Sequence, residues 1–200
     1  MRKTRNKTRR RKQKGGDLCK GDTSQYKADK TVVLGKGAYG TVYGVKDNPN
    51  LAIKVQVVPI QGKMGEMFTQ KLQNELAIST LAGEVGIGPK IHHLAICDTI
   101  TGKSQTIIWV MDRIYGDTVY DFLGKYEDDL KKQGKTPAEI KKMEYQKRKE
   151  FNDEIVRMVE TLEKKRIQWG DIHNANIMYG SIEGGPPKIY IIDYGEFTFV

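Results

Sequence analysis

A short polar turn followed by an apolar strand constrains the fold of this 200-residue chain more than any other feature. The turn contains Asp171 and Asn176, five residues apart, and the segment from Ile189 to Asp193 alternates like a strand before the chain reaches Gly195. A carboxylate, a carboxamide and a second carboxylate at this spacing provide a proton acceptor and oxygen ligands for Mg²⁺. These groups suit phosphoryl transfer, so the turn predicts a site for that chemistry.

The positive charge of the chain is confined to its first residues. The chain carries 34 Lys and Arg against 25 Asp and Glu, and nine of the basic residues lie between Arg2 and Lys14 with no acid among them. The remainder is therefore formally neutral. Segment 1–24 is predicted to be a disordered basic tail. Two interpretations of the tail stay open: an arm that binds nucleic acid or directs nuclear import, and a solubilising extension.

The same composition bears on localisation. The sequence contains no apolar run of 18 residues, so no membrane span is expected. The two cysteines, Cys19 and Cys97, predict no framework of bridges or metal ligands, and an intracellular protein of the cytoplasm or nucleus is expected.

The N-terminal half predicts a sheet with one helix. Residues 31–34 and 51–58 alternate like strands, and Gly35, Gly37 and Gly40 lie between them. A β-branched strand follows these glycines where a dinucleotide-binding fold would require a helix, so the pattern favours a glycine-rich hairpin whose amides can approach phosphates. A helix is predicted over 66–81, and two further strands over 91–100 and 105–111.

From about Val32 to Gly195 the chain resembles a protein kinase-like domain. The motifs that carry the resemblance are the glycine hairpin, Leu-Ala-Ile-Lys ending at Lys54, the Asp171 to Asn176 turn, and Asp193-Tyr-Gly. The resemblance implies an α+β, two-lobed kinase-like fold with a truncated C-terminal lobe. Residues 25–111 would form an ATP-binding lobe, and residues 112–200 an abbreviated catalytic lobe.

The resemblance also implies roles for individual residues. Asp171 would be the catalytic base, Asn176 and Asp193 would hold Mg²⁺, and Lys54 would contact ATP with Glu75 as its ion-pair partner. Glu66 is the second candidate for that partner. His173 would either contact the γ-phosphate or simply be hydrogen-bonded within the loop. The implied nucleotide-binding residues are Gly35, Lys36, Gly37, Ala38, Gly40, Val42, Ala52, Lys54, Met111, Asp112 and Ile114, the last three in the hinge between the lobes.

Three functions follow as alternatives. The glycine hairpin and Leu-Ala-Ile-Lys favour a reduced protein Ser/Thr kinase, which is the leading interpretation. The run from Gly170 to His173 is similar to the Gly-Asp-Leu-His of aminoglycoside and choline phosphotransferases and favours a small-molecule acceptor. The absence of the peptide-docking platform of protein kinases also favours the small-molecule acceptor. The end of the chain at Val200 by itself favours a non-catalytic nucleotide-binding or interaction protein. A compact kinase with a basic arm also resembles proteins of large DNA viruses, so association with a virion is a further expectation.

The last third of the chain predicts two helices and an uncovered surface. Thr118 begins a short helix ending at Leu123, residues 125–135 form a charged insertion, and a long helix runs from Thr136 to about 165. The apolar stripe of that helix, with Phe197 and Phe199, is expected to be covered by a second copy of the chain or by a partner protein. The alternative is that the C-terminal segment folds back over the helix and covers the stripe itself.

Overall fold

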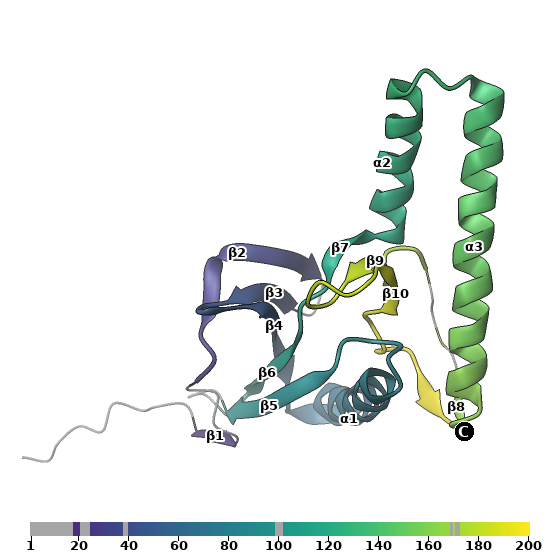
Figure 1. The fold of residues 1–200 in the computed structure, drawn as a ribbon. Coiled ribbons are helices and arrows are strands. Elements are labelled where there is room, and N and C mark those ends of the chain that lie inside the picture. The colour runs from purple at the N-terminus through teal and green to yellow at the C-terminus, as the bar shows by residue number, and fades with distance from the viewer. Residues whose placement is uncertain (1–17, 21–24, 38–39, 99–101, 169, 171–172) are drawn as a thin grey trace, which may run out of the picture.

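The protein is a mixed structure of helices and antiparallel sheets, as the sequence predicted at the level of an α+β class (Figure 1). The computed structural model describes residues 18–20, 25–37, 40–98, 102–168, 170 and 173–200. Within that part of the chain, none of the helices has the length and apolar character needed to cross a membrane.

A six-stranded antiparallel sheet forms the first half of the molecule, in the order β1-β5-β6-β4-β3-β2. Its strands are β1 (Leu18–Lys20), β2 (Ala28–Gly37), β3 (Gly40–Val45), β4 (Asn48–Pro59), β5 (Ile91–Asp98) and β6 (Ser104–Asp112). The central strand β4 has alternate side chains on opposite faces. On one face Leu51 and Ile53 pack with Val45 and Val110 in a small apolar cluster. The other face meets a helix.

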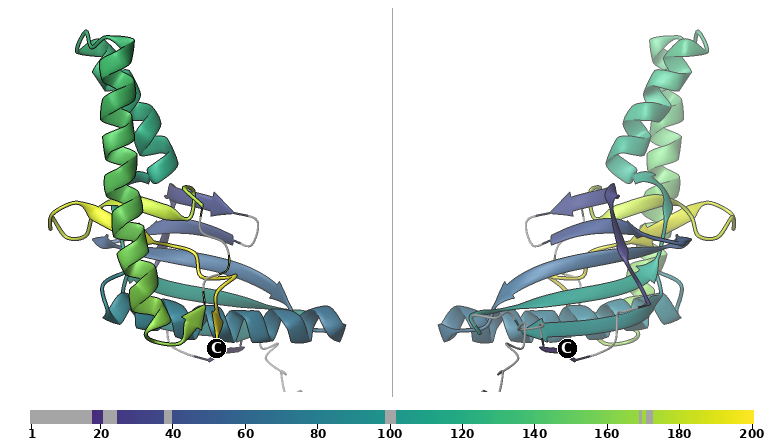
Figure 2. Two further views of the ribbon diagram at one scale, coloured as in Figure 1. Left: turned by 90° about the vertical axis from the view of Figure 1, so that its right-hand side faces the viewer. Right: turned by 90° about the vertical axis from the view of Figure 1, so that its left-hand side faces the viewer.

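That helix, α1 (Gly62–Glu84), begins before and ends after the predicted segment 66–81. Figure 2 shows it running alongside the sheet, at the opposite end of the molecule from the tip of the helical hairpin. Leu72 and Leu76, one helical turn apart, pack on Ile107 and Trp109 of β6. The predicted apolar spacing therefore fixes which side of α1 faces the sheet.

A helical hairpin projects from the rest of the fold (Figures 1 and 2). It follows the short strand β7 (Tyr115–Thr118) and consists of α2 (Val119–Lys132) and α3 (Pro137–Glu163). The Thr118 hydroxyl accepts from the Asp121 backbone N–H at 3.1 Å, which caps α2. Thr136 and Glu139 form the predicted capping box of α3.

The predicted end of α2 at Leu123 is wrong, because the helix continues through the charged segment to Lys132. Two features explain the continuation. Leu130 is 2% exposed and faces α3, and Lys131 pairs with Glu127 one turn earlier at 2.7 Å.

The last quarter of the chain forms two small sheets, ordered β10-β9-β7 and β11-β8. Their strands are β8 (Ile167–Gln168), β9 (Ile177–Ser181), β10 (Lys188–Ile191) and β11 (Thr198–Phe199). β11 folds back along the end of α3, where Phe199 pairs with Ile167 in the ladder.

This return of the chain corrects the prediction of an uncovered apolar surface. Phe197 is 2% exposed, and it packs with Tyr194, Met158 and Leu162 in the largest core cluster. Burying a Phe side chain stabilises the fold by roughly 1.5–3 kcal/mol. Phe199 and the terminal Val200 stay open, at 48% and 70% exposure. The C-terminal segment itself covers the stripe of α3, so the reason given for a covering partner is removed.

The N-terminal edge of the sheet brings two more corrections. Residues 18–20, assigned to the disordered tail, form β1 and pair with β5, while residues 1–17 lie outside the described part. Cys19 lies directly opposite Cys97 in this pair. Cys97 is disulfide-bonded, contrary to the expectation of unbridged cysteines. The pairing of β1 with β5 was not visible in sequence, because it joins segments almost 80 residues apart.

Candidate functional site

The first element of the site is an ion pair beneath the glycine hairpin. Lys54 lies on the central strand β4, and its Nζ donates to Glu75 Oε1 at 2.7 Å. The two side chains are 19% and 12% exposed, and Nζ also lies 5.3 Å from the centroid of the Trp109 ring. The predicted partner, Glu75, is therefore confirmed over Glu66, which is exposed in the first turns of α1.

Helix periodicity explains why Glu75 reaches the lysine. Leu72 and Leu76 hold α1 against the sheet, and Glu75, three residues after Leu72, projects from the same side of the helix. The ion pair is partly shielded from solvent, so its attraction is screened less than that of an exposed pair. It therefore fixes the position of the ammonium group under the hairpin.

Strand register gathers most of the predicted nucleotide-binding residues on one face of the sheet. Directly opposed residues in antiparallel strands share a face. Val42 opposes Lys54, and Ala52 opposes Met111. Together with Gly35, Gly37 and Gly40, these residues line the face that carries Lys54 and Trp109. Lys36 opposes Thr41 and so belongs to the other face.

The glycines of the hairpin fall into two kinds. A Cβ on Gly40 would collide with the carbonyl oxygen of Val55 and lie 2.9 Å from Cγ of Gln56, so packing alone excludes a side chain there. A Cβ on Gly35 or Gly37 would meet nothing within 4 Å. These two glycines leave the backbone open on the side of Lys54. The predicted residue Ala38, at the tip, lies outside the described residues.

The segment after β6, predicted to be the hinge, is held by its own contacts. The Asp112 backbone N–H donates to the Lys90 carbonyl at 3.0 Å, and the Asp112 carboxylate binds the Lys90 N–H at 3.0 Å and His92 Nε2 at 2.6 Å. Within the described structure, the N–H of Ile114 has no hydrogen-bond partner. A ligand with an acceptor atom can therefore bind at Ile114, whereas the Asp112 N–H is already occupied.

The second half of the site lies at the ends of β9 and β10. Ile177 pairs with Ile191, and the Ile192 N–H donates to the Asn176 carbonyl at 3.0 Å. Because Asp193 directly follows Ile192 in the chain, this hydrogen bond places Asn176 beside Asp193. The Asp193 Oδ1 accepts from the Gly195 N–H at 3.0 Å, which closes a tight turn around the carboxylate.

The catalytic base predicted from sequence, Asp171, lies outside the described residues, but its neighbours are placed. The His173 carbonyl accepts from the Asn176 N–H at 2.8 Å, and His173 Nδ1 accepts from the Ala175 N–H at 3.3 Å. The imidazole is thus hydrogen-bonded within the turn itself. A Cβ on Gly170 would collide with the Glu196 carbonyl, so the turn and the Asp193 segment are in direct contact.

Contacts with α1 join the two halves. The Ile191 N–H donates to the Ile87 carbonyl at 3.0 Å, just after α1, and Lys71 on α1 pairs with Glu196 at 3.0 Å. Ile78 and Tyr194 lie in one apolar cluster. The helix that positions Glu75 therefore also supports the turn that carries Asp193.

The donor set at Asn176 and Asp193 suits a small hard cation. Among the described residues, no group of three or more His, Cys, Asp or Glu side chains is arranged to bind a metal ion. Mg²⁺ is usually held by one or two carboxylates together with substrate phosphates, and it keeps several waters. One carboxylate and one carboxamide oxygen at the end of a β-hairpin fit that requirement.

A depression of ≈ 630 Å³ adjoins the turn at Asn174, between α2 and α3. Its wall includes Asp117, Tyr120, Asp121 and Lys125. The Asn174 carbonyl accepts from the Tyr120 N–H at 3.3 Å, which joins the wall of the depression to the polar turn. Sequence reasoning missed this feature, because it depends on the unexpected length of α2.

No protein-family model matches this chain, and no curated protein matches its sequence.

Proposed function

We propose that this protein is an ATP-dependent phosphotransferase that transfers the γ-phosphate of Mg·ATP to a hydroxyl group. The observation that carries the proposal is the Lys54–Glu75 ion pair, held at 2.7 Å beneath a glycine hairpin with open backbone. A fixed cation and a glycine backbone that phosphates can approach closely are the groups that bind a chain of phosphates.

We also infer that the fold is two-lobed and kinase-like. Three features support this inference: the five strands β2 to β6 with α1 inserted after β4, the connection at 112–114, and a helical hairpin that precedes the β9–β10 turn. In this fold the two groups of predicted residues come from different lobes and face one nucleotide.

The proposed chemistry assigns each residue one task. Lys54 contacts the phosphates, and Glu75 holds Lys54 in place. Asn176 and Asp193 hold Mg²⁺, which neutralises charge on the phosphates when bound. The oxygen of the acceptor hydroxyl forms a bond to the γ-phosphorus, and the bond between that phosphorus and the leaving oxygen of ADP breaks. Asp171 accepts the proton that the hydroxyl loses.

The proposed acceptor is a Ser or Thr hydroxyl of a protein. The support for this choice is the glycine hairpin with Leu-Ala-Ile-Lys, the motif that resembles protein kinases. A small-molecule acceptor is the second candidate, favoured by the depression beside Asn174. Its volume, ≈ 630 Å³, lies in the range of small-molecule sites, roughly 300–1,000 Å³.

Radiolabelled ATP tests the proposal. The full chain is incubated with γ-labelled ATP and Mg²⁺, with casein and basic protein as protein acceptors, and with choline and an aminoglycoside as small acceptors. Label on protein supports the first candidate, and label on a small acceptor supports the second. Absence of label on any acceptor, with no release of phosphate to water, would overturn the proposed function.

Two variants separate binding from chemistry. Asp171→Asn should abolish transfer and leave the affinity for Mg·ATP nearly unchanged, because the proton acceptor is lost and the metal ligands remain. Asp193→Ala should weaken Mg·ATP binding itself, because a metal ligand is removed. Equal loss of nucleotide binding in both variants would contradict these two roles.

A further inference from the structure

The outward face of α3 carries a row of cations around one aromatic ring. At intervals of three and four residues along the helix, exposed side chains line up on one face. They are Lys141, Lys142, Tyr145, Arg148, Lys149, Asn152 and Val156. No acid occupies a position of this set, which we call the α3 stripe. Tyr145 is 70% exposed in the middle of the cations.

Three of the seven acids of α3 have partners, and the other four, from Asp153 to Glu163, follow the last cation of the stripe. Glu139 closes the capping box, and Glu150 pairs with Lys147, which lies off the stripe. Glu144 approaches Arg148 only to 3.9 Å. In the described part of the chain, Lys141, Lys142 and Lys149 have no ion-pair partner. Their charges are therefore available to a ligand.

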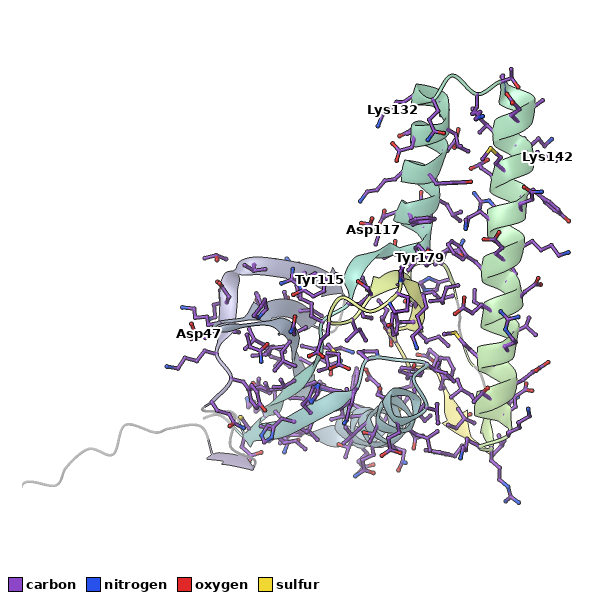
Figure 3. The ribbon with its side chains drawn as sticks, in the orientation of Figure 1. Asp47, Tyr115, Asp117, Lys132, Lys142 and Tyr179 are labelled. Carbon is purple, nitrogen blue, oxygen red and sulfur yellow. The ribbon has the colours of Figure 1, made fainter. Side chains whose placement is uncertain are left out.

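The α3 stripe runs along the flank of the helix: Lys141 and Arg148 border depressions that Glu127 of α2 also lines, so this edge of the stripe lies beside α2. Ile140 and Phe151 turn inwards, and Phe151 packs against Phe122 of α2 with ring centroids 5.5 Å apart. Figure 3 shows Lys142 pointing away from α2 on the projecting part of the hairpin. The exposed ring of Tyr145 contributes little to the packing of the hairpin, so it is available to a ligand.

We propose that the α3 stripe binds single-stranded nucleic acid. From Lys141 to Lys149 the helix advances about 12 Å, which spans two to three phosphates of an extended strand. Four cations on such a row neutralise phosphates, and the ring of Tyr145 stacks on an unpaired base. An acidic protein segment would use the cations but not the ring, and a duplex would keep its bases out of reach.

This site is separate from the Lys54 nucleotide site and from the basic tail, although Arg148 also borders the depression beside Asn174. The tail is a row of charges without an aromatic residue before Tyr26, so it can bind phosphates but offers no aromatic ring on which a base could stack. The α3 stripe adds base contact on the folded part of the protein.

Binding of a fluorescein-labelled 20-nucleotide thymidine strand to the full chain, followed by anisotropy over a range of salt, tests the proposal. The test variant combines Lys141→Gln, Lys142→Gln, Arg148→Gln and Lys149→Gln. The matched control removes four other exposed lysines, by Lys30→Gln, Lys46→Gln, Lys90→Gln and Lys103→Gln. Each phosphate contact on a single strand contributes about 0.7 to the slope of log affinity against log salt, so the test variant should lower that slope by about 3. The control should change it by less than about 1. Equal effects of the two variants would overturn the site.

The aromatic ring gives a second, independent readout. Tyr145→Ala should weaken binding of the thymidine strand about tenfold, and Tyr145→Phe should leave it unchanged, because stacking needs only the ring. An abasic strand of the same length should bind the wild type and Tyr145→Ala equally. A tenfold loss on the abasic strand too would exclude base stacking. Stripe-dependent binding of polyglutamate as tight as that of the thymidine strand would identify an acidic protein as the partner and overturn the proposal.

Discussion

Tyr194, the middle residue of the Asp193-Tyr-Gly195 turn, carries a buried hydroxyl whose removal should stabilise the protein. The side chain is 3% exposed, and its hydroxyl has no hydrogen-bond partner among the described residues. Burial raises the pKa of this phenol well above its usual value, so the group stays neutral. A Cβ on Gly88 would lie 2.6 Å from the hydroxyl, which shows how closely the backbone there approaches it.

The size of the effect follows from these contacts. An unpaired buried hydroxyl costs about 1–3 kcal/mol relative to its hydrated state in the unfolded chain. Tyr194→Phe removes that cost and keeps the ring, which packs on Phe197 with centroids 5.1 Å apart. Removal of the oxygen leaves a small cavity, which offsets part of this gain. The free energy of unfolding should therefore rise by about 1–2 kcal/mol. For a chain of this length the melting temperature should rise by roughly 2–8 °C.

Urea denaturation of the full chain under non-reducing conditions measures this change. Tyr190→Phe is the matched control, because Tyr190 is 5% exposed but its hydroxyl is not among the buried polar atoms without a partner. Tyr190→Phe should not increase the free energy of unfolding by more than about 0.5 kcal/mol. If Tyr194→Phe lowers stability by more than about 0.5 kcal/mol, the hydroxyl makes a hydrogen bond and the reasoning is refuted.

Three further predictions concern positions around the site and the hairpin. Hydrogen bonds from the Thr136 backbone N–H and hydroxyl lower the pKa of Glu139. The stabilisation of α3 by this carboxylate is therefore complete at a pH above the ordinary pKa of Glu, and it is lost as the pH falls through the lowered pKa. Glu139→Gln should reduce this acid sensitivity of α3 helicity, measured by circular dichroism. Lys71→Glu should lower stability by up to about 1 kcal/mol because it repels Glu196, and the exchanged pair Lys71→Glu with Glu196→Lys should restore it in a urea double-mutant cycle. Gly170→Ala should lower the free energy of unfolding by about 1–3 kcal/mol, because its Cβ would meet the carbonyl of Glu196; unchanged stability would show that the two segments can separate without cost.

Local patterns predicted the parts of the site that depend on one element at a time. The apolar spacing of α1 was sufficient to choose Glu75 over Glu66, because helix geometry fixes which side chains share a face. The glycines between β2 and β3 predicted the hairpin, and the alternation of β4 predicted the position of Lys54. In each case the structural consequence is set within about ten residues.

Features that depend on distant segments were not predictable in this way. The burial of Phe197 depends on β11 returning to β8, about 30 residues earlier, and nothing near Phe197 in the sequence indicates that return. The bond at Cys97 similarly depends on β1 reaching the edge of β5. The continuation of α2 past Leu123 depends on Leu130 finding α3 across the hairpin. Tertiary packing decided all three.

The central claim is that Lys54 positions the phosphates of a nucleotide. The most direct test is the value of kcat/KM for ATP in the wild type and in Lys54→Met, with Lys90→Met as a control that removes an exposed lysine just before β5. Loss of a fixed cation at the transferred phosphate should lower kcat/KM by about 10²–10³ in Lys54→Met, with Lys90→Met within about twofold of the wild type. Equal ATP turnover in the wild type and Lys54→Met would contradict the account.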